Sequence, residues 1–474
     1  MVFKNYYGID LVETKCGQFK IIEIHGLTDG VSFSERAKYS PRFSRIYKYV
    51  DILKGMRQNG DKIIYSMDIK SSNNHILPRS LKQFYESIPF GFSHLDWISE
   101  RIESDKDKQK KIEDFNKTGN STEIMNDVNY LKKSARQNGV ADDFHIGRAL
   151  KFDNDNMYFQ EFNFKDMRYD CKIIPRAKIG LFVNWGDNLY FHPKMLAYSY
   201  NGNDKDSFEI INTQTISASL GVTVPKWTPR LLIKYFCNDI NLDDIFLNEI
   251  YLGMGLSSYN EIEQFVCSLS ENDVDLLAVK KPMCTHYGTD VSFLNKDVLD
   301  DMIEIEKDIY PQLESVRNRI WLANESGFNF SKNDLVNGAF DWPWINSYGR
   351  RVYPFVEMGS YILQEFVDTM PVESFKTGKM HQGVIRAQVV GGQTVAVMYR
   401  LPEEEYSKGK FVDMTLKENR TFFERADDDL ESRVFDFLSH ILTSLEENLK
   451  AVPINTVEKV RQNEIKYLFG KSSD

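Results

Sequence analysis

Three residues near the start of the chain, Asp10, Glu23 and His25, have types and a spacing that could bind a metal ion. The apolar runs Tyr7–Val12 and Phe19–Ile24 flank a short polar turn, which predicts a β-hairpin with alternating faces. Side chains two residues apart on a strand point the same way, so we expect the three polar groups to lie close together near one face. Two neighbouring carboxylates repel each other unless a cation lies between them, and their hard oxygen atoms suit Mg²⁺. The alternative interpretation is a surface hairpin whose acidic groups are solvated.

A second set of residues, within 275–294 (DLLAVKKPMCTHYGTDVSFL), could bind phosphate. The pattern predicts a strand that delivers Lys281, followed by a loop that contains Thr285, Gly288 and Thr289. A lysine held at a strand end offers a compact positive charge to phosphate oxygens. A hydroxyl-rich loop with a glycine can lay backbone N–H groups over the same phosphates. Taken alone, the segment also fits an ordinary strand–turn–strand unit.

Two later segments could complete a nucleotide site. Residues 361–368 (YILQEFVD) predict an apolar strand that ends in Gln364 and Glu365. Residues 384–400 predict a hairpin across a Gly-Gly turn, with Arg386 on one strand and Arg400 on the other. Because both arginines lie in otherwise apolar strands, each is expected to need an anionic partner.

Hydrophobic periodicity predicts the elements that must position these residues. Further strands are expected at 62–67, 177–185, 188–191 and 208–212, and helices at 34–57, 242–253, 259–269, 297–316 and 430–450. The last helix has an apolar stripe from Val434 to Leu449 at helical spacing. Between Met157 and Ile174 the pattern is mixed and predicts no single element.

Charge and composition exclude several classes of function. The formal net charge of −10 argues against a general nucleic-acid or anionic-membrane binder, because both need a basic surface. No apolar run approaches the roughly 18–20 residues that a transmembrane helix needs, and the opening residues lack the apolar core of a signal peptide. The five cysteines show no CxxC spacing, which is typical of reduced thiols. We therefore expect a cytoplasmic protein with neither nucleic acid nor membrane as a partner.

The order of these features resembles the ATP-grasp family of ATP-dependent carboxylate–amine ligases. The shared series is a Lys-Pro strand, a glycine loop, a Gln-Glu-Phe-Val hinge, a Gly-Gly hairpin with arginine, and a long helix. In that family the metal-binding hairpin follows the long helix, whereas here the chain ends soon after the helix and the matching hairpin is at the N-terminus. This order is similar to the circularly permuted members, such as eukaryotic-type glutathione synthetase. The resemblance covers residues 1–30 and roughly 205–450.

The resemblance implies roles for the nucleotide-binding residues. Lys281 and Arg386 would be catalytic, with Lys281 on the ATP phosphates and Arg386 at the γ-phosphate or the acyl-phosphate intermediate. The loop residues that would cover the phosphates are Thr285, Gly288 and Thr289, and the hinge residues beside adenine are Gln364, Glu365, Phe366 and Val367. The second ATP-contacting lysine of the family has two candidates here, Lys226 and Lys234.

The resemblance also implies two Mg²⁺ ions, held by Asp10, Glu23 and His25. The family usually has asparagine where this chain has His25, and imidazole is a poorer Mg²⁺ ligand than an amide oxygen. This substitution favours, as one alternative, a binding protein that kept the fold and lost the chemistry.

The expected fold is α/β (α+β) and of the ATP-grasp type: two lobes clasp ATP between antiparallel sheets, circularly permuted, with an extra α/β lobe in the N-terminal half. The expected division is a permuted metal-binding hairpin and helix at 1–57, a substrate lobe at 58–212, a small ATP-grasp lobe at 213–365 and a large one at 366–474. The expected reaction joins a small-molecule or peptide carboxylate to an amine through an acyl phosphate. Besides the inactive binding protein, the alternatives are an ATP-dependent phosphotransferase on the same fold and an accidental match of motifs.

Overall fold

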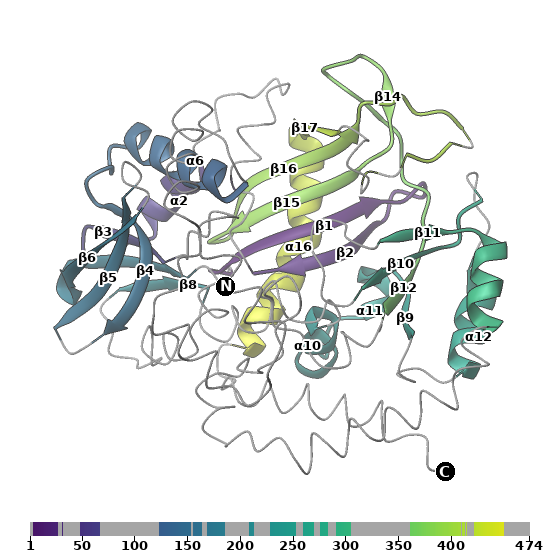
Figure 1. The fold of residues 1–474 in the computed structure, drawn as a ribbon, viewed down its shortest axis with the longest axis horizontal. Helices are drawn as coiled ribbons and strands as arrows, with labels where there is room; N and C mark the ends of the chain where they lie inside the picture. Colours follow the sequence, from purple (N-terminus) through teal and green to yellow (C-terminus); the bar gives the residue numbers. More distant parts are fainter. Residues whose placement is uncertain are drawn as a thin grey trace, which may run out of the picture.

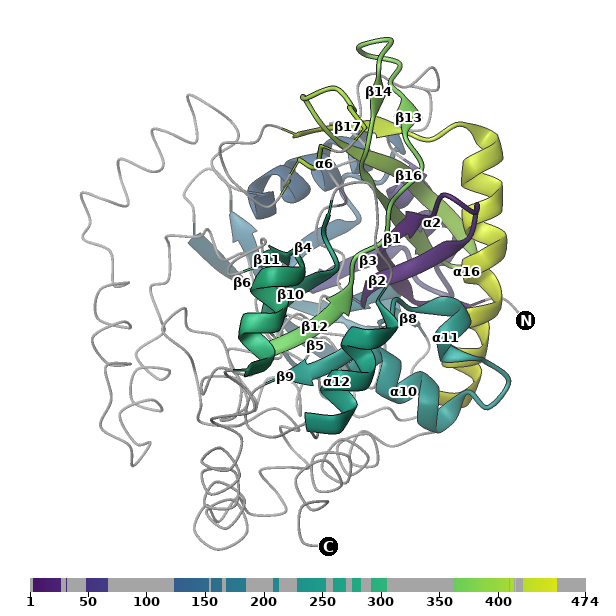
Figure 2. The same ribbon diagram turned by 90° about the vertical axis from the view of Figure 1, so that its right-hand side faces the viewer.

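Three sheets and one small hairpin form the framework of the described chain (Figures 1 and 2). The computed structural model describes residues 3–26, 31, 48–66, 123–152, 155–163, 168–184, 208–212, 228–252, 259–269, 275–282, 291–304, 361–408, 410–412, 414 and 421–449. The class is mixed α/β with several antiparallel sheets, which agrees with the α+β expectation. The predicted domain boundaries stay a prediction.

Strands from residues 6–25 and from residues 384–425 share one five-stranded antiparallel sheet, in the order β17-β16-β15-β1-β2. Its strands are β1 (Tyr6–Glu13), β2 (Phe19–His25), β15 (Val384–Val390), β16 (Gln393–Pro402) and β17 (Thr421–Arg425). The predicted N-terminal hairpin is confirmed, because β1 and β2 pair as neighbours. The predicted hairpin at 384–400 is confirmed as well, and β1 lies against its first strand.

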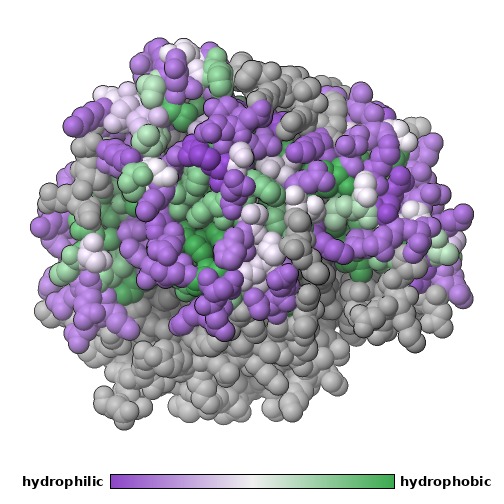
Figure 3. Space-filling view, turned by 180° about the vertical axis from the view of Figure 1, so that it is seen from behind, coloured by the Kyte–Doolittle hydropathy of each residue, from purple (hydrophilic) through white to green (hydrophobic). Residues whose placement is uncertain are grey.

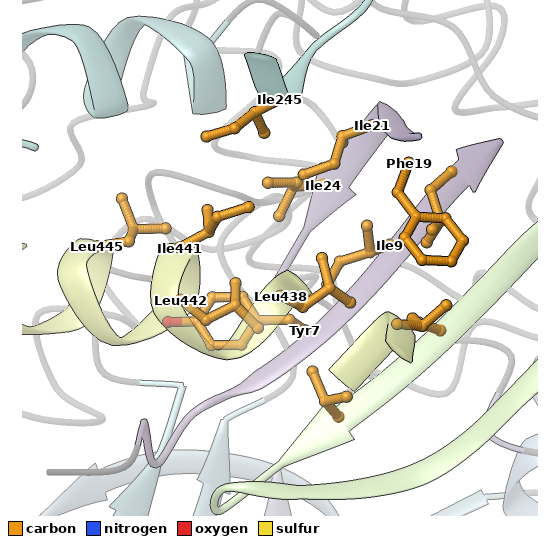
Figure 4. Close-up of a cluster of buried hydrophobic side chains, with 14 of the residues drawn as sticks. Tyr7, Ile9, Phe19, Ile21, Ile24, Ile245, Leu438, Ile441, Leu442 and Leu445 are labelled. Atoms are coloured by element: carbon orange, nitrogen blue, oxygen red, sulfur yellow. The ribbon is translucent and has the colours of Figure 1, made fainter. Parts of the chain in front are cut away.

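Helix α16 (Asp428–Leu449) covers one face of this sheet, as predicted by the apolar stripe of that segment. Its buried residues include Leu438, Ile441, Leu442 and Leu445. They pack against Tyr7, Ile9 and Leu11 of β1 and against Ile21 and Ile24 of β2. Helices α10 (Thr228–Phe236) and α11 (Leu242–Ile245) complete the cluster, as Figure 4 shows for part of it. The alternation of apolar residues along β1 and β2 therefore turns one face toward α16, and the opposite face carries polar side chains such as Asp10 beside Tyr6, which enters a second cluster.

Glu446 of α16 ties the first strand to the helix. Its carboxylate accepts hydrogen bonds from the backbone N–H groups of Lys4 and Asn5, each at 2.6 Å, and from the Tyr7 hydroxyl at 3.0 Å. Burial and the neighbouring Glu446 charge raise the pKa of Tyr7 well above its ordinary value, so this hydroxyl remains a donor.

The second sheet is four-stranded and antiparallel, in the order β11-β10-β12-β9. Its strands are β9 (Glu249–Leu252), β10 (Ala278–Pro282), β11 (Ser292–Leu294) and β12 (Tyr361–Glu365). Helix α12 (Tyr259–Ser268) and a helical segment at 296–304 cover one face through a cluster that includes Ile262 and Leu299. The prediction of a helix over 242–253 is wrong beyond residue 245, because Glu249–Leu252 pairs with β12 as an edge strand.

The third sheet is six-stranded and mixed, in the order β6-β5-β4-β3-β7-β8. Its strands are β3 (Lys62–Ser66), β4 (Phe144–Phe152), β5 (Asn156–Asn163), β6 (Arg168–Pro175), β7 (Ile179–Asn184) and β8 (Glu209–Ile211), and the short helix η2 (Arg176–Lys178) precedes β7. Helices α2 (Lys48–Gly55) and α6 (Glu123–Gln137) share a hydrophobic cluster with this sheet. Tyr6, Val390 and Val395 of the five-stranded sheet belong to the same cluster, so the two sheets share a core.

A row of charged and polar side chains crosses four neighbouring strands of the six-stranded sheet. Glu161 accepts a bond from His145 Nδ1 at 2.9 Å and forms an ion pair with Lys172, while Lys62 Nζ lies 3.1 Å from His145 Nε2. Burial alone would raise the pKa of Glu161, but the bonds and charges of His145 and Lys172 outweigh it and lower this pKa to about 2.

We expect the stabilisation from Glu161 to depend on pH in a defined window. Its carboxylate has a pKa lowered from 4.5 to about 2, so its contribution is complete above about pH 4.5 and is lost as the pH falls toward 2. The variant Glu161→Gln should therefore be less stable than wild type at pH 7, with a difference that shrinks between pH 4.5 and 2. Urea unfolding of both proteins across this range measures the difference, and a difference that does not vary with pH would contradict the assignment.

Several predicted elements are shorter in the structure or lie outside the described residues. Helix α2 occupies only the end of the predicted helix 34–57, and residues 32–47 are outside the described part. The strand predicted at 188–191 is also outside it, and the mixed segment after Met157 forms the antiparallel pair β5–β6. None of the described helices is both long and apolar enough to cross a membrane. Seen from behind, the described residues expose hydrophilic side chains interspersed with apolar ones (Figure 3).

Candidate functional site

Four of the predicted site residues lie on the face of the five-stranded sheet that is opposite α16: Asp10, Glu23, His25 and Arg386. Ile9 and Leu11 of β1 enter the core with α16, so Asp10 between them points to the other face. Its direct partners in the pairing are Glu23 on β2 and Arg386 on β15, which therefore share that face. His25 lies two residues after Glu23 and shares its face by strand alternation, while a bulge at Ile22 lets both Ile21 and Ile24 face the core.

Asp10 and Arg386 form a two-pronged ion pair. Arg386 Nε donates to Asp10 Oδ1 and Nη2 donates to Oδ2, each at 2.6 Å. The two side chains are only 20% and 23% exposed, so solvent screens the pair weakly. Burial by itself raises the pKa of Asp10, but the charge and hydrogen bonds of Arg386 outweigh it, so that this pKa lies below its ordinary value. The anionic partner expected for Arg386 is thus a carboxylate of the chain itself.

His25 lies across Gly8, its partner on β1. A Cβ atom at position 8 would lie 2.1 Å from Cε1 of the imidazole, so any residue other than glycine would displace the ring. His25 also contributes to the lowered pKa of Asp10 through its charge interaction. Gly8 was not singled out in the sequence, although a glycine inside an apolar strand is a known sign of close approach.

A resident Mg²⁺ ion would need ligands that this arrangement does not supply. Mg²⁺ requires about six oxygen ligands in near-octahedral geometry. Both oxygens of Asp10 already hold a guanidinium, and His25 offers nitrogen instead of oxygen. Among the residues that the structure describes, no group of three or more His, Cys, Asp or Glu side chains is placed to hold a metal ion. In this arrangement the residues do not fit a resident magnesium site, and the metal role of Asp10, Glu23 and His25 stays a prediction.

Two of the predicted nucleotide-binding residues meet in the four-stranded sheet. Lys281 Nζ donates to Gln364 Oε1 at 3.0 Å, and Gln364 Nε2 donates to Glu249 Oε2 at 3.3 Å. Lys281 is 5% exposed and Gln364 is 2% exposed. They lie on the face away from α12, because Ala278 and Leu363 face the cluster on the other side. An ammonium is thereby fixed at the end of β10.

The predicted hinge is held by hydrogen bonds from its backbone and from the side chain of Glu365. The Glu365 N–H donates to Asn248 O at 2.8 Å, and the Phe366 N–H donates to Leu277 O at 2.9 Å. The Glu365 carboxylate also accepts from the Asn248 backbone and side chain, at 2.9 and 3.0 Å. These two amides are therefore committed to the fold, and base recognition through them would require other contacts to break.

An aromatic trio lies beside the hinge and was not anticipated from the sequence. Phe366 packs edge-on against Phe293 and Phe411, with ring centroids 6.2 and 5.3 Å away. Phe293 and Phe411 are themselves 4.4 Å apart. All three rings are partly exposed, and such rings can contact the face of a flat ligand.

The hinge also links the two sheets. Residues 368–370 follow it and join the tip of the β1–β2 hairpin: Lys15 pairs with Asp368 at 2.8 Å, and Met370 N donates to Glu13 O at 2.9 Å. Phe246 forms a parallel bridge with Ile21 on the other edge of the hairpin. The four-stranded sheet accordingly lies beside β2 in both ribbon views (Figures 1 and 2).

The remaining predicted residues are either outside the described chain or differently engaged. Thr285, Gly288, Thr289 and Lys226 lie outside the described residues. Lys234 is exposed on α10. Arg400, for which an anionic partner was expected, donates to the backbone oxygen of Met414 at 2.9 Å and contributes to the lowered pKa of Asp10. One N–H group of Arg400 is thus hydrogen-bonded to a neutral carbonyl oxygen.

No protein-family model and no curated protein sequence matches the chain. Among solved structures, one similar chain is described as "Putative gamma-glutamylcysteine synthetase" from Methylobacillus flagellatus KT. The two chains are 9% identical with a TM-score of 0.38, over 98% of this chain and 90% of the other. A likeness this weak supports no conclusion on fold or activity.

Proposed function

We propose that this chain is an ATP-dependent carboxylate–amine ligase with a circularly permuted ATP-grasp arrangement. The observation that carries the proposal is the meeting of residues from opposite ends of the sequence. Asp10 and Arg386 pair on one sheet face, with Glu23 and His25 beside them. The family order places its acidic hairpin and its hairpin arginine in the same lobe, and the pairing of β1 with β15 supports the permuted version of that order.

The nucleotide would lie between the two sheets that the hinge links. Lys281, fixed by Gln364, would add positive charge near the phosphates from the four-stranded sheet, and Arg386 would do so from the five-stranded sheet. Fixed charges aimed at a transferring phosphoryl group stabilise its transition state without reorganisation. Magnesium would arrive as part of the substrate, bound to ATP.

In the proposed reaction, a carboxylate oxygen attacks the γ-phosphorus of ATP and ADP leaves, which gives an acyl phosphate. An amine then attacks the acyl carbon, and inorganic phosphate leaves with the formation of an amide. The chain's residues hold and orient these groups, and little proton transfer by side chains is needed. The lobe with the six-stranded sheet would hold one of the two organic substrates.

The proposal is tested by ADP and phosphate release from MgATP in the presence of pooled amino acids, peptides and polyamines. We expect ADP and phosphate in equal amounts, together with an amide product seen by mass spectrometry. A stable phosphorylated product would instead favour the phosphotransferase, and ATP binding without turnover in any pool would favour an inactive binding protein. Absence of both ATP binding and turnover would overturn the nucleotide site altogether.

A further inference from the structure

The carboxylate of Asp10 already has a cation. The guanidinium of Arg386 donates one hydrogen bond to each of its oxygens at 2.6 Å, a geometry that a lysine or a hydrated ion cannot reproduce. The pair is four-fifths buried and comes from neighbouring positions on two central strands, so backbone pairing holds both residues in place. A charge-neutralised carboxylate attracts a second cation only weakly.

The groups around this pair are those that could bind a divalent ion if the guanidinium left. Glu23 is the direct partner of Asp10 on β2, and His25 lies two residues after Glu23 on the same face and helps to lower the pKa of Asp10. A guanidinium and a divalent ion cannot both sit against one carboxylate without strong repulsion. Whether Arg386 is paired with Asp10 therefore determines whether Asp10, Glu23 and His25 can bind a divalent ion.

We propose that Arg386 is the resident cation of this site in the nucleotide-free protein, and that it keeps free divalent ions out. An anion that draws the guanidinium away would open the site, so a metal ion would enter only together with its nucleotide. The identity of that anion as a nucleotide phosphate rests on the proposed function, whereas the exclusion of free metal does not.

The exclusion is tested by Mn²⁺ binding without nucleotide, followed through the loss of the electron paramagnetic resonance signal of free Mn²⁺. Mn²⁺ accepts carboxylate and imidazole ligands and reports binding directly. The proteins compared are wild type, Arg386→Ala and the double variant Arg386→Ala/Asp10→Asn. Arg433→Ala is the matched control, because Arg433 forms a similar 2.6 Å ion pair with Glu13 of the same strand.

We expect Arg386→Ala to bind one Mn²⁺ at least about tenfold more tightly than wild type, since one opposing unit charge a few ångström away has been removed. The gain should disappear in the double variant, and Arg433→Ala should behave as wild type. Arg386→Gln, which keeps a long polar side chain, replaces the alanine variant if the latter loses the wild-type circular dichroism spectrum.

Two results would overturn the exclusion: tight Mn²⁺ binding by wild type at this site, or no gain in whichever Arg386 variant keeps the fold. Neither result depends on ATP turnover. If the wild-type protein never releases ADP but the variant gains Mn²⁺ binding, the proposed ligase activity is wrong and the exclusion of free metal is still supported.

Discussion

Replacing Lys281 with alanine should lower ATP-dependent ADP release by about 100- to 1,000-fold, the range measured when one preorganised charge-stabilising group is removed from an active site. The ammonium is held in place by Gln364 and is 5% exposed, so a nearby phosphate would feel its charge with little screening. Steady-state ADP release at saturating MgATP and substrates measures the effect. The rate and the Michaelis constant for ATP should be determined separately.

Lys280 provides a matched control on the same strand. It pairs with Leu363, which packs toward α12, so its side chain belongs to the opposite face of the sheet. Lys280→Ala should keep the wild-type rate. Lys281→Met retains the aliphatic stem and removes only the charge, which separates an electrostatic effect from a packing defect. Full activity in Lys281→Met would show that the charge has no role in turnover.

Replacing Glu446 with alanine should lower the free energy of unfolding by about 2–4 kcal/mol, because three hydrogen bonds to a carboxylate are lost and two backbone N–H groups lose their acceptor. Since the bonds join α16 to the residues just before and within β1, the loss should also expose the first strand. Urea unfolding gives the free energy, and hydrogen exchange of residues 4–12 gives the location.

Glu447 is the adjacent control, since it is exposed on the same helix. Glu447→Ala should change stability by less than about 0.5 kcal/mol, as is usual for surface substitutions away from such contacts. If Glu446→Ala and Glu447→Ala lower the free energy of unfolding equally, the loss comes from a weaker helix α16 and not from the broken link between α16 and the first strand.

The periodic elements could be predicted from the sequence, but their long-range partners only in part. The alternation in Tyr7–Val12 and Phe19–Ile24 and the apolar stripe of α16 are local patterns, and the structure confirms all three elements. The helix prediction over 242–253 failed because the segment Glu249–Leu252 gains its strand structure from pairing with β12, more than 100 residues later. The helical pattern of this segment is therefore overridden by its long-range strand pairing.

The candidate site shows the same limit. The shared face of Asp10 and Glu23 follows from strand alternation and hairpin pairing, and could be predicted. The ion pair of Asp10 with Arg386 depends on the register between β1 and β15, which no local pattern contains. The sequence therefore indicated a need for positive charge at Asp10 and suggested a metal ion, whereas a cross-strand arginine supplies it. The aromatic trio at the hinge likewise joins residues from three separate segments.

Strand β1 lies in the interior of the five-stranded sheet, between β15 and β2, and this position bears on how the protein is made. Strand β1 is synthesised before its neighbour β15, which follows 376 residues later, counted from Asp10 to Arg386. At common translation rates that interval is roughly 20 to 75 s, during which an apolar strand has an unpaired edge. We expect this delay to favour chaperone binding to the nascent β1–β2 segment and aggregation of fragments that stop short of β15, because both would leave one edge of β1 unpaired.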